Sequence, residues 1–158
     1  MQTQVMFYLL PNTDKADASD INASSALYHA CLQASYFYRQ NKRVFIYTQD
    51  QQCAEQIDEM LWAFDSDSFV PHNLSGEGPK QGAAVEISHQ APRGRRPVLI
   101  NLTNTVPNFA SQFQFIVDFV PSDETLKQLA RERFKACRQQ GFQVDNQAVS
   151  IPAPPESA

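Results

Sequence analysis

Residues 4–10 read QVMFYLL and residues 43–48 read RVFIYT, and these two apolar runs decide the fold class. Both are rich in β-branched and aromatic residues and are apolar at consecutive positions, which is typical of strands buried on both faces. Between them, apolar residues recur at helical spacing along residues 23–40, namely at Leu27, Ala30, Cys31, Ala34 and Tyr38. A strand, a helix and a second strand in this order predict a βαβ unit.

The same alternation continues toward the C-terminus. Asp50 is placed to cap a second helix over residues 51–63, and residues 66–83 contain enough proline and glycine to predict an irregular loop. We expect strands at 84–88, 97–102 and 114–120, a short helical turn at 107–112 and a last helix at 122–141. The sequence therefore predicts an α/β fold with three layers, in which helices cover both faces of a mostly parallel central sheet.

One domain accounts for most of the chain. The 158 residues, with a mass of 17.8 kDa, are enough to bury one hydrophobic core. We assign residues 1–144 to a single α/β domain. Residues 145–158 read DNQAVSIPAPPESA, which is polar and proline-rich, and we expect a disordered tail there.

Composition narrows the classes of function. The formal charge of -4 and the pI near 5.3 disfavour a general nucleic-acid binder, which is usually basic over a whole face. The three cysteines lie far apart within helical patterns, so we interpret them as reduced side chains. No apolar run is long enough to span a bilayer, and we expect a cytoplasmic protein without a membrane partner.

No motif predicts catalysis, a metal or a cofactor. Glycines 76, 78 and 82 have the spacing G-x-G-x-x-x-G and precede a strand, whereas a phosphate-binding loop leads into a helix. The histidines 29, 72 and 89 are scattered without metal-ligand spacing. For His72 we expect a hydrogen bond within its loop. We therefore expect a protein that is not an enzyme and that holds neither metal nor cofactor.

Four cations define what we call the basic face of the last helix: Lys127, Arg131, Lys135 and Arg138. At about 100° per residue they fall within an arc of roughly 80°. The cations repel one another, so an anionic ligand would stabilise them. A solvated face stabilised by the helix dipole explains the pattern equally well.

Three other side chains stand out in the helical patterns. Phe134 lies at the edge of the apolar stripe, next to the basic face, and this pairing suits a negatively charged peptide that ends in an aromatic residue. Trp62 lies about 130° away from the stripe of its own helix, which favours either an interface or packing under a loop. Arg133 falls inside the apolar stripe, and we expect a buried partner, either Asp118 or Glu86.

Several short sequence motifs occur along the chain in a fixed order. They are LW at 61–62, SFVPHNL at 68–74, GEGP at 76–79, VEI at 85–87, VDFVP at 117–121 and LKQLARERFK at 126–135. In this set the chain closely resembles the chi subunit of bacterial DNA polymerase III holoenzyme, over about residues 4–144. The resemblance implies a noncatalytic clamp-loader accessory protein with a Rossmann-like sheet that lacks the phosphate-binding loop.

The resemblance also implies two protein partners. One is the acidic C-terminal tail of single-stranded DNA-binding protein, for which it indicates Trp62, Val120, Lys127, Arg131, Phe134 and Lys135. The other is the psi subunit, which ties chi to the clamp loader, and here it indicates Phe69, Pro71, Leu74 and Ile87. DNA would then be contacted only indirectly, through its coating protein.

Two other functions stay open at the level of sequence. The order of strands and helices also fits a nucleotide-dependent enzyme on a Rossmann-like sheet. Arg93, Arg95 and Arg96 form a basic cluster between two strands, which could bind single-stranded nucleic acid directly together with the basic face. A solvated loop is the better interpretation of that cluster, and the net acidity disfavours direct binding.

Overall fold

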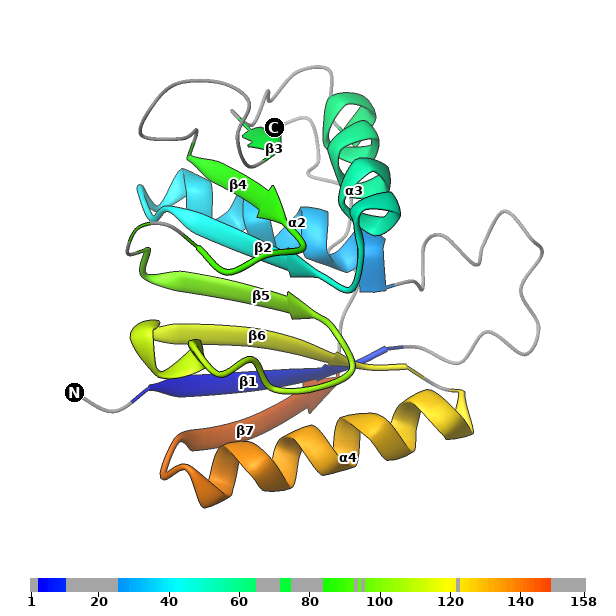
Figure 1. Cartoon of the computed structure of the whole chain (residues 1–158), viewed down its shortest axis with the longest axis vertical. Coiled ribbons are helices and arrows are strands. Elements are labelled where there is room, and N and C mark those ends of the chain that lie inside the picture. The colour runs from blue at the N-terminus through cyan, green and yellow to red at the C-terminus, as the bar shows by residue number, and fades with distance from the viewer. Residues whose placement is uncertain are drawn as a thin grey trace.

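The seven strands of the described chain form one sheet. The structure is a computed structural model that describes residues 3–10, 26–64, 72–74, 84–92, 94, 96–121 and 123–148. The strands are β1 (Gln4–Leu9), β2 (Val44–Thr48), β3 (His72–Leu74), β4 (Val85–Ser88), β5 (Val98–Leu102), β6 (Phe115–Val120) and β7 (Gln143–Ala148). Their order across the sheet is β3-β4-β2-β5-β6-β1-β7, and every pairing is parallel (Figure 1).

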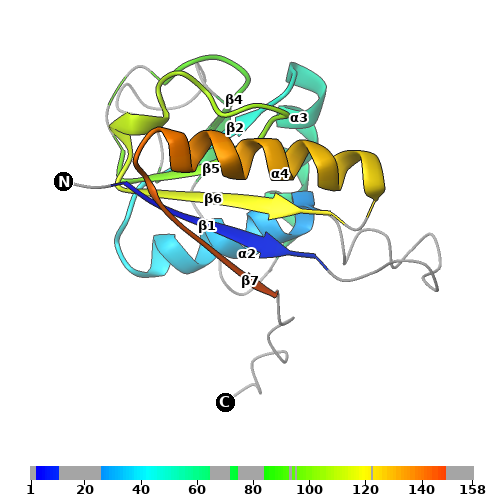
Figure 2. The same ribbon diagram turned by 90° about the horizontal axis from the view of Figure 1, so that it is seen from below.

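Helices lie on both faces of this sheet. The helices are α2 (Ala26–Arg39), α3 (Gln51–Phe64) and α4 (Glu124–Gln139), with a short 3-10 helix, η1 (Ala110–Gln112). Figure 2 shows α2 and α4 on opposite faces. The α2 side holds a core that contains Ala34, Ile57 and Ile100, and the α4 side holds a second core that contains Phe7, Phe45 and Leu99. The predicted three-layer α/β fold with a parallel sheet is confirmed.

Local signals fix where the helices begin and end. Asp50 caps α3, since its Oδ1 accepts a hydrogen bond from the Cys53 backbone N–H at 2.8 Å, and Asp123 caps α4 in the same manner. At the end of α4 the N–H of Gly141, with φ of 84°, bonds to the Arg138 carbonyl, and Phe142 N–H bonds to the Cys137 carbonyl. This Schellman motif needs a left-handed residue, which glycine supplies, and it turns the chain back into β7.

A buried ion pair joins α4 to the sheet. Arg133 Nε lies 2.9 Å from Asp118 Oδ2, and Arg133 Nη2 donates to Asp118 Oδ1 at 3.0 Å. Nη2 also donates to the Phe119 carbonyl at 3.1 Å. Burial raises the pKa of Asp118, and the charge of Arg133 opposes that rise. Of the two partners expected for Arg133, Asp118 is the one found.

Glu86 pairs instead with Arg96. Both side chains are buried, and the guanidinium of Arg96 also lies over the Phe45 ring. Burial lowers the pKa of Arg96, while Glu86 raises it. The expectation of a solvated loop is therefore wrong for Arg96, because its charge is balanced by a strand carboxylate. Arg93 and Arg95 lie outside the described residues.

Two short strands were missed by the sequence patterns. β3 lies within residues 66–83, which we had expected to be loop, and β7 continues to Ala148 although we had placed the start of the tail at residue 145. In β7 only Val144 is half-buried and the other side chains are exposed, so the strand has no apolar alternation. Backbone pairing with β1 from Gln143 to Ala148 forms it instead. Residues 149–158 lie outside the described residues, so the expected disorder of the tail stays a prediction there.

Buried thiols agree with the expectation of reduced cysteines. Cys31 and Cys137 are buried and form no disulfide, and burial raises the pKa of each thiol to about 12. Cys53 is half-buried and also free. Cys137 belongs to the α4 core and Cys31 to the α2 core, so each serves as a small apolar side chain.

The buried pair gives a testable prediction about stability. Replacing Arg133 by methionine leaves the Asp118 carboxylate buried without its positively charged partner, and we expect a loss of about 3–5 kcal/mol in the free energy of unfolding. The exposed Arg131→Met, on the same helix, should change it by less than about 0.5 kcal/mol. Urea denaturation measures both. A further change, Asp118→Leu in the Arg133→Met background, should restore much of the loss, and equal effects of the two single substitutions would contradict this account.

Candidate functional site

The basic face lies on the outer side of α4, away from the sheet. Arg131, Lys135 and Arg138 are exposed, whereas Arg133 on the same helix points into the core. The Arg133–Asp118 pair sets this rotation of the helix. The predicted grouping of the four cations on one solvent-facing side of the helix is thereby confirmed.

Two of these cations are available for an external anion. Lys127 Nζ lies 3.7 Å from Glu124 Oε1, one helical turn earlier, and its side chain is one-third exposed. The Arg138 guanidinium lies 5.9 Å from the centroid of the Phe134 ring. Within the part of the chain that the structure describes, Arg131 and Lys135 form no ion pair. An acidic ligand would therefore meet Arg131 and Lys135 first.

An apolar border lies beside the basic face. Phe134 is half-buried and its ring packs 5.3 Å from that of Phe7 in β1. Val120, at the end of β6, is half-buried against the same core and pairs in register with Leu9 of β1. Leu9 is 41% exposed, which is high for a leucine inside a strand. Because side chains alternate along a strand, Phe7 and Leu9 face the same side of the sheet as α4.

Leu9 is a candidate residue that the sequence patterns missed. It lies within the apolar run of residues 4–10, where every position was expected to be buried. Only the parallel register shows that it stands opposite Val120 at the carboxyl end of its strand. No signal in the sequence separates it from the buried residues around it.

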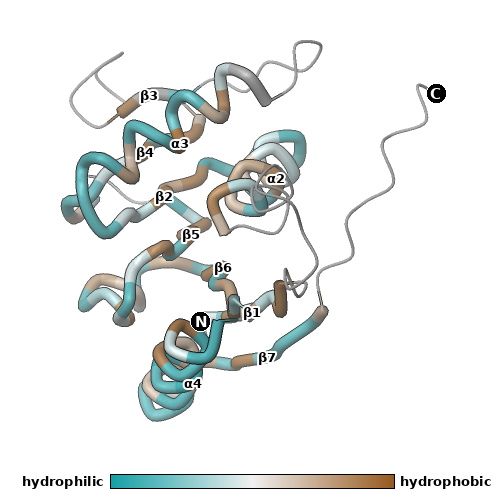
Figure 3. The backbone as a smooth tube through the Cα atoms, turned by 90° about the vertical axis from the view of Figure 1, so that its right-hand side faces the viewer, coloured by the Kyte–Doolittle hydropathy of each residue, from teal (hydrophilic) through white to brown (hydrophobic). Residues whose placement is uncertain are grey.

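Trp62 lies on a different helix from the basic face. It is 62% exposed, as its position off the apolar stripe predicts, but it lies on α3, which packs against β3 and β4. α3 lies beside β3 and β4, near one end of the strand order, and α4 lies beside β7 at the other end (Figures 1 and 3). The expectation that Trp62 shares a pocket with Val120 and Phe134 stays a prediction.

Trp62 packs against His72 of β3. The two ring centroids are 4.9 Å apart, and His72 Nε2 lies 3.3 Å from an Asp58 carboxylate oxygen on α3. His72 therefore contacts a helix, and its expected hydrogen bond within the loop stays a prediction, because most of that loop lies outside the described residues. Trp62 accordingly stands next to the segment that contains the residues indicated for the psi subunit.

Those residues have different environments. Leu74 is half-buried, and Ile87 is completely buried in the α2 core. The side chain of Ile87 therefore offers no surface to a partner, because β4 is an inner strand covered by α3 and by β3. Phe69 and Pro71 lie outside the described residues.

Two hollows in the described structure lie elsewhere. One, of about 330 Å³, lies between α2 and the β1–β6 part of the sheet, and the other, of about 150 Å³, lies at the carboxyl ends of β5 and β6 beside Asp118 and Arg133. In the smaller hollow Asn101 and Thr103 are already engaged, because the Thr103 hydroxyl donates to the Asn101 side chain at 2.6 Å. Among the described residues, no group of three His, Cys, Asp or Glu is placed to hold a metal ion. None of the described helices has the length and apolar character needed to cross a membrane.

A comparison of folds gives a distant match. The T4 UvsW structure superposes with a TM-score of 0.60 and 9% sequence identity, covering 94% of this chain and 41% of that chain. At this identity the match concerns the fold alone.

Comparisons of sequence are specific. The family described as DNA polymerase III chi subunit, HolC, matches residues 1–145. The chain is 46% identical to DNA polymerase III subunit chi of Escherichia coli over 88% of its own length and 93% of the relative. It is 38% identical to the Haemophilus influenzae subunit, over 94% and 99%, and 31% identical to the Pseudomonas aeruginosa subunit, over 89% and 92%. The match to the family and the near-complete coverage of these relatives show that the chain belongs to the DNA polymerase III chi subunit family.

Proposed function

We propose that this chain is a noncatalytic adaptor of the DNA polymerase III clamp-loader complex, which joins that complex to single-stranded DNA-binding protein during replication. Membership of the chi family makes it an accessory subunit of DNA polymerase III. The basic face of α4 binds the acidic C-terminal tail of single-stranded DNA-binding protein, and a second surface binds the psi subunit. The observation that carries the proposal is a set of exposed cations bordering a half-buried aromatic ring.

The basic face has the chemistry that an acidic tail requires. Arg131 presents a planar guanidinium that can bind a carboxylate through two parallel hydrogen bonds. Lys127 and Lys135 lie one turn away on either side and add positive charge, since Lys127 can exchange its long contact with Glu124 for a ligand carboxylate. Phe134 is held in place by Phe7, so its ring is positioned before a ligand arrives.

The apolar part of the tail would lie against Phe134, Val120 and Leu9. Val120 and Leu9 are paired at the carboxyl ends of adjacent strands, and both retain exposed surface. An aromatic residue that ends an acidic segment would bury its ring there while its carboxylates meet Arg131. In this assignment Trp62 is not part of the tail site.

The psi subunit would bind at the other edge of the sheet. Trp62 supplies a large exposed ring next to β3, and β3 contains Leu74, which follows Phe69 and Pro71 in the sequence. Tryptophan is enriched among the residues that dominate binding energy at interfaces. We therefore move Trp62 from the tail site to the psi surface and remove Ile87, which is buried.

The two other functions have less support. Arg96 is neutralised by Glu86, which takes it out of any direct phosphate-binding cluster, and the formal charge of -4 disfavours binding to bare DNA. No observed feature favours a nucleotide over any other ligand. Binding to naked single-stranded DNA, measured beside binding to the tail peptide, separates direct DNA binding from the adaptor function.

The proposed tail site predicts how the loss of the Arg131 charge changes the affinity for an acidic peptide. Arg131→Ala should weaken binding of an acidic peptide that ends in an aromatic residue by about 1.5–3 kcal/mol, the value for hydrogen bonds to a charged group. Titration calorimetry measures the affinity. Arg39→Ala is the matched control, because Arg39 is an exposed arginine on α2, across the sheet. Unchanged affinity in Arg131→Ala, or an equal loss in Arg39→Ala, would contradict the assignment.

Salt should weaken the same complex. The contacts are charge-assisted and partly exposed, so raising the salt concentration from about 0.05 to about 0.5 M should screen them and lower the affinity steadily. The Arg131→Ala variant should show a shallower dependence, because it has lost one of the screened charges. An affinity that does not change with salt would indicate a ligand held by apolar contacts alone.

Trp62 distinguishes the two surfaces. Trp62→Ala should weaken binding of the psi subunit by about 2 kcal/mol or more, the range for a dominant interface residue, and should leave the affinity for the acidic peptide unchanged. The side chain is 62% exposed, so the fold should tolerate the change. Calorimetry with each partner in turn measures both. Loss of peptide binding in this variant would restore Trp62 to the tail site and refute the separation.

A further inference from the structure

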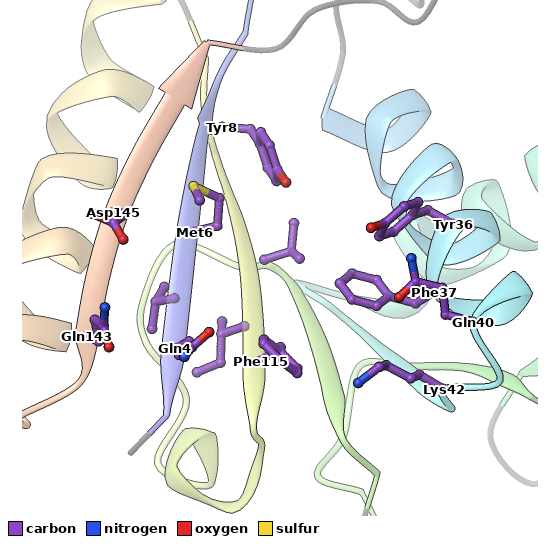
Figure 4. Close-up of a pocket in the computed structure, with 13 residues that line it drawn as sticks. Gln4, Met6, Tyr8, Tyr36, Phe37, Gln40, Lys42, Phe115, Gln143 and Asp145 are labelled. Carbon is purple, nitrogen blue, oxygen red and sulfur yellow. The ribbon is translucent and has the colours of Figure 1, made fainter. Parts of the chain in front are cut away.

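An aromatic hollow lies on the face of the sheet opposite α4. It has a volume of about 330 Å³ between α2 and strands β1 and β6, and we define it by the rings of Tyr8, Tyr36, Phe37 and Phe115 (Figure 4). Tyr36 is 55% exposed, and the other three rings are half-buried. Neither proposed partner of the chain is assigned to this face.

Polar groups of suitable type surround these rings. Lys42 Nζ lies 4.9 Å from the centroid of the Phe115 ring at one end of the hollow. The amide side chains of Gln4, Gln40 and Gln143 line it as well. Proline-rich segments in the polyproline II conformation bind to aromatic grooves, where their unpaired carbonyl groups accept hydrogen bonds from such donors. The hollow therefore fits a short proline-rich segment.

We propose that the aromatic hollow is the docking site of this chain's own proline-rich segment, residues 150–156. The segment reads SIPAPPE, with prolines at 152, 154 and 155 and an acid at 156. It follows β7 directly, and two residues of β7, Gln143 and Asp145, already line the hollow. The occupant is thus the continuation of a strand that forms one wall of the site.

The lengths agree with docking in the same molecule. β7 ends at Ala148, in register with Leu9, and the far end of the hollow lies at the level of Gln4 and Phe115. That is five residues back along the strands, or about 17 Å. If residues 149–151 reverse the chain, residues 152–156 span about 16 Å in the polyproline II conformation.

The charges in the hollow agree with a segment that runs from the Tyr8 end toward the Gln4 end. With residue 152 near Tyr8, the carboxylate of Glu156 reaches the end of the hollow where Lys42 lies. Asp145, the acidic residue in the lining, stands on β7, across the hollow from Lys42 (Figure 4). Docked in this direction, Glu156 would lie closer to Lys42 than to Asp145.

Weak intrinsic affinity is enough for such docking. A short flexible connection gives an effective concentration of about a millimolar, so a segment with a dissociation constant of about a tenth of a millimolar would be docked about nine-tenths of the time. The three prolines restrict the free segment to conformations near the bound one, which reduces the entropy lost on docking. The site therefore needs no large contact area.

Nuclear magnetic resonance of the ¹⁵N-labelled full chain tests the proposal. The chain in which Pro152, Pro154 and Pro155 are all replaced by alanine should show shifted amide resonances for Tyr36, Phe37 and Phe115, and those of exposed α3 residues such as Gln52 should not move. In the wild-type chain the amides of Ala153 and Glu156 should have order parameters above about 0.6, and the triple substitution should lower them.

Two substitutions at the hollow sharpen the test. Tyr36→Ala should lower the order parameters of Ala153 and Glu156, whereas Tyr36→Phe, which keeps the ring, should preserve them. The proposal is overturned if the wild-type and triple-alanine chains have the same resonances at the hollow. It is also overturned if the shifts grow with protein concentration, which would mean that the segment of a second copy fills the hollow.

Discussion

The buried ion pair between Arg133 and Asp118 determines how α4 lies on the sheet. Arg133 donates to both carboxylate oxygens of Asp118 and to the Phe119 carbonyl, so three hydrogen bonds fix the rotation of the helix. A hydrophobic stripe alone would allow the helix to roll by part of a turn, because apolar contacts are not directional. With Arg133 turned inward, Phe134 must lie against Phe7, and the basic face must point to solvent. The buried Arg133–Asp118 pair thus determines in which direction the basic face of α4 points.

The three layers of the fold can be predicted from hydrophobic patterns in the sequence. Consecutive apolar residues at 4–10 and 43–48, with helical periodicity between them, are sufficient for a parallel sheet covered on both faces. The basic face could likewise be predicted, because the four cations lie on one helix and their relative angles depend only on the helical repeat. Predictions of this kind succeed because each depends on one element and its own periodicity.

The features that the sequence could not settle concern relations between elements. β7 has no apolar pattern, since a parallel edge strand beside β1 needs only its backbone groups to pair. The assignment of Trp62 to the tail site is of the same kind, because nothing in the sequence states which face of the sheet α3 or α4 covers. Ile87 sits in a strand that looks accessible until β3 is known to form the edge beyond it. Strand order is a property of the whole sheet, and no local window of sequence contains it.

The strand order also decides whether two partners can bind together. α3 lies at the β3 edge of the sheet and α4 at the β7 edge, and five strands separate β3 from β7. The proposed adaptor requires both ligands to be bound at once, and ligands at opposite edges would neither collide nor compete for the same cations. A rigid parallel sheet holds the two surfaces at a constant separation without any conformational change. Because the chain is acidic overall, its cations attract a ligand locally at α4 rather than along the whole molecule. This arrangement favours a short acidic peptide over the extended phosphate backbone of DNA.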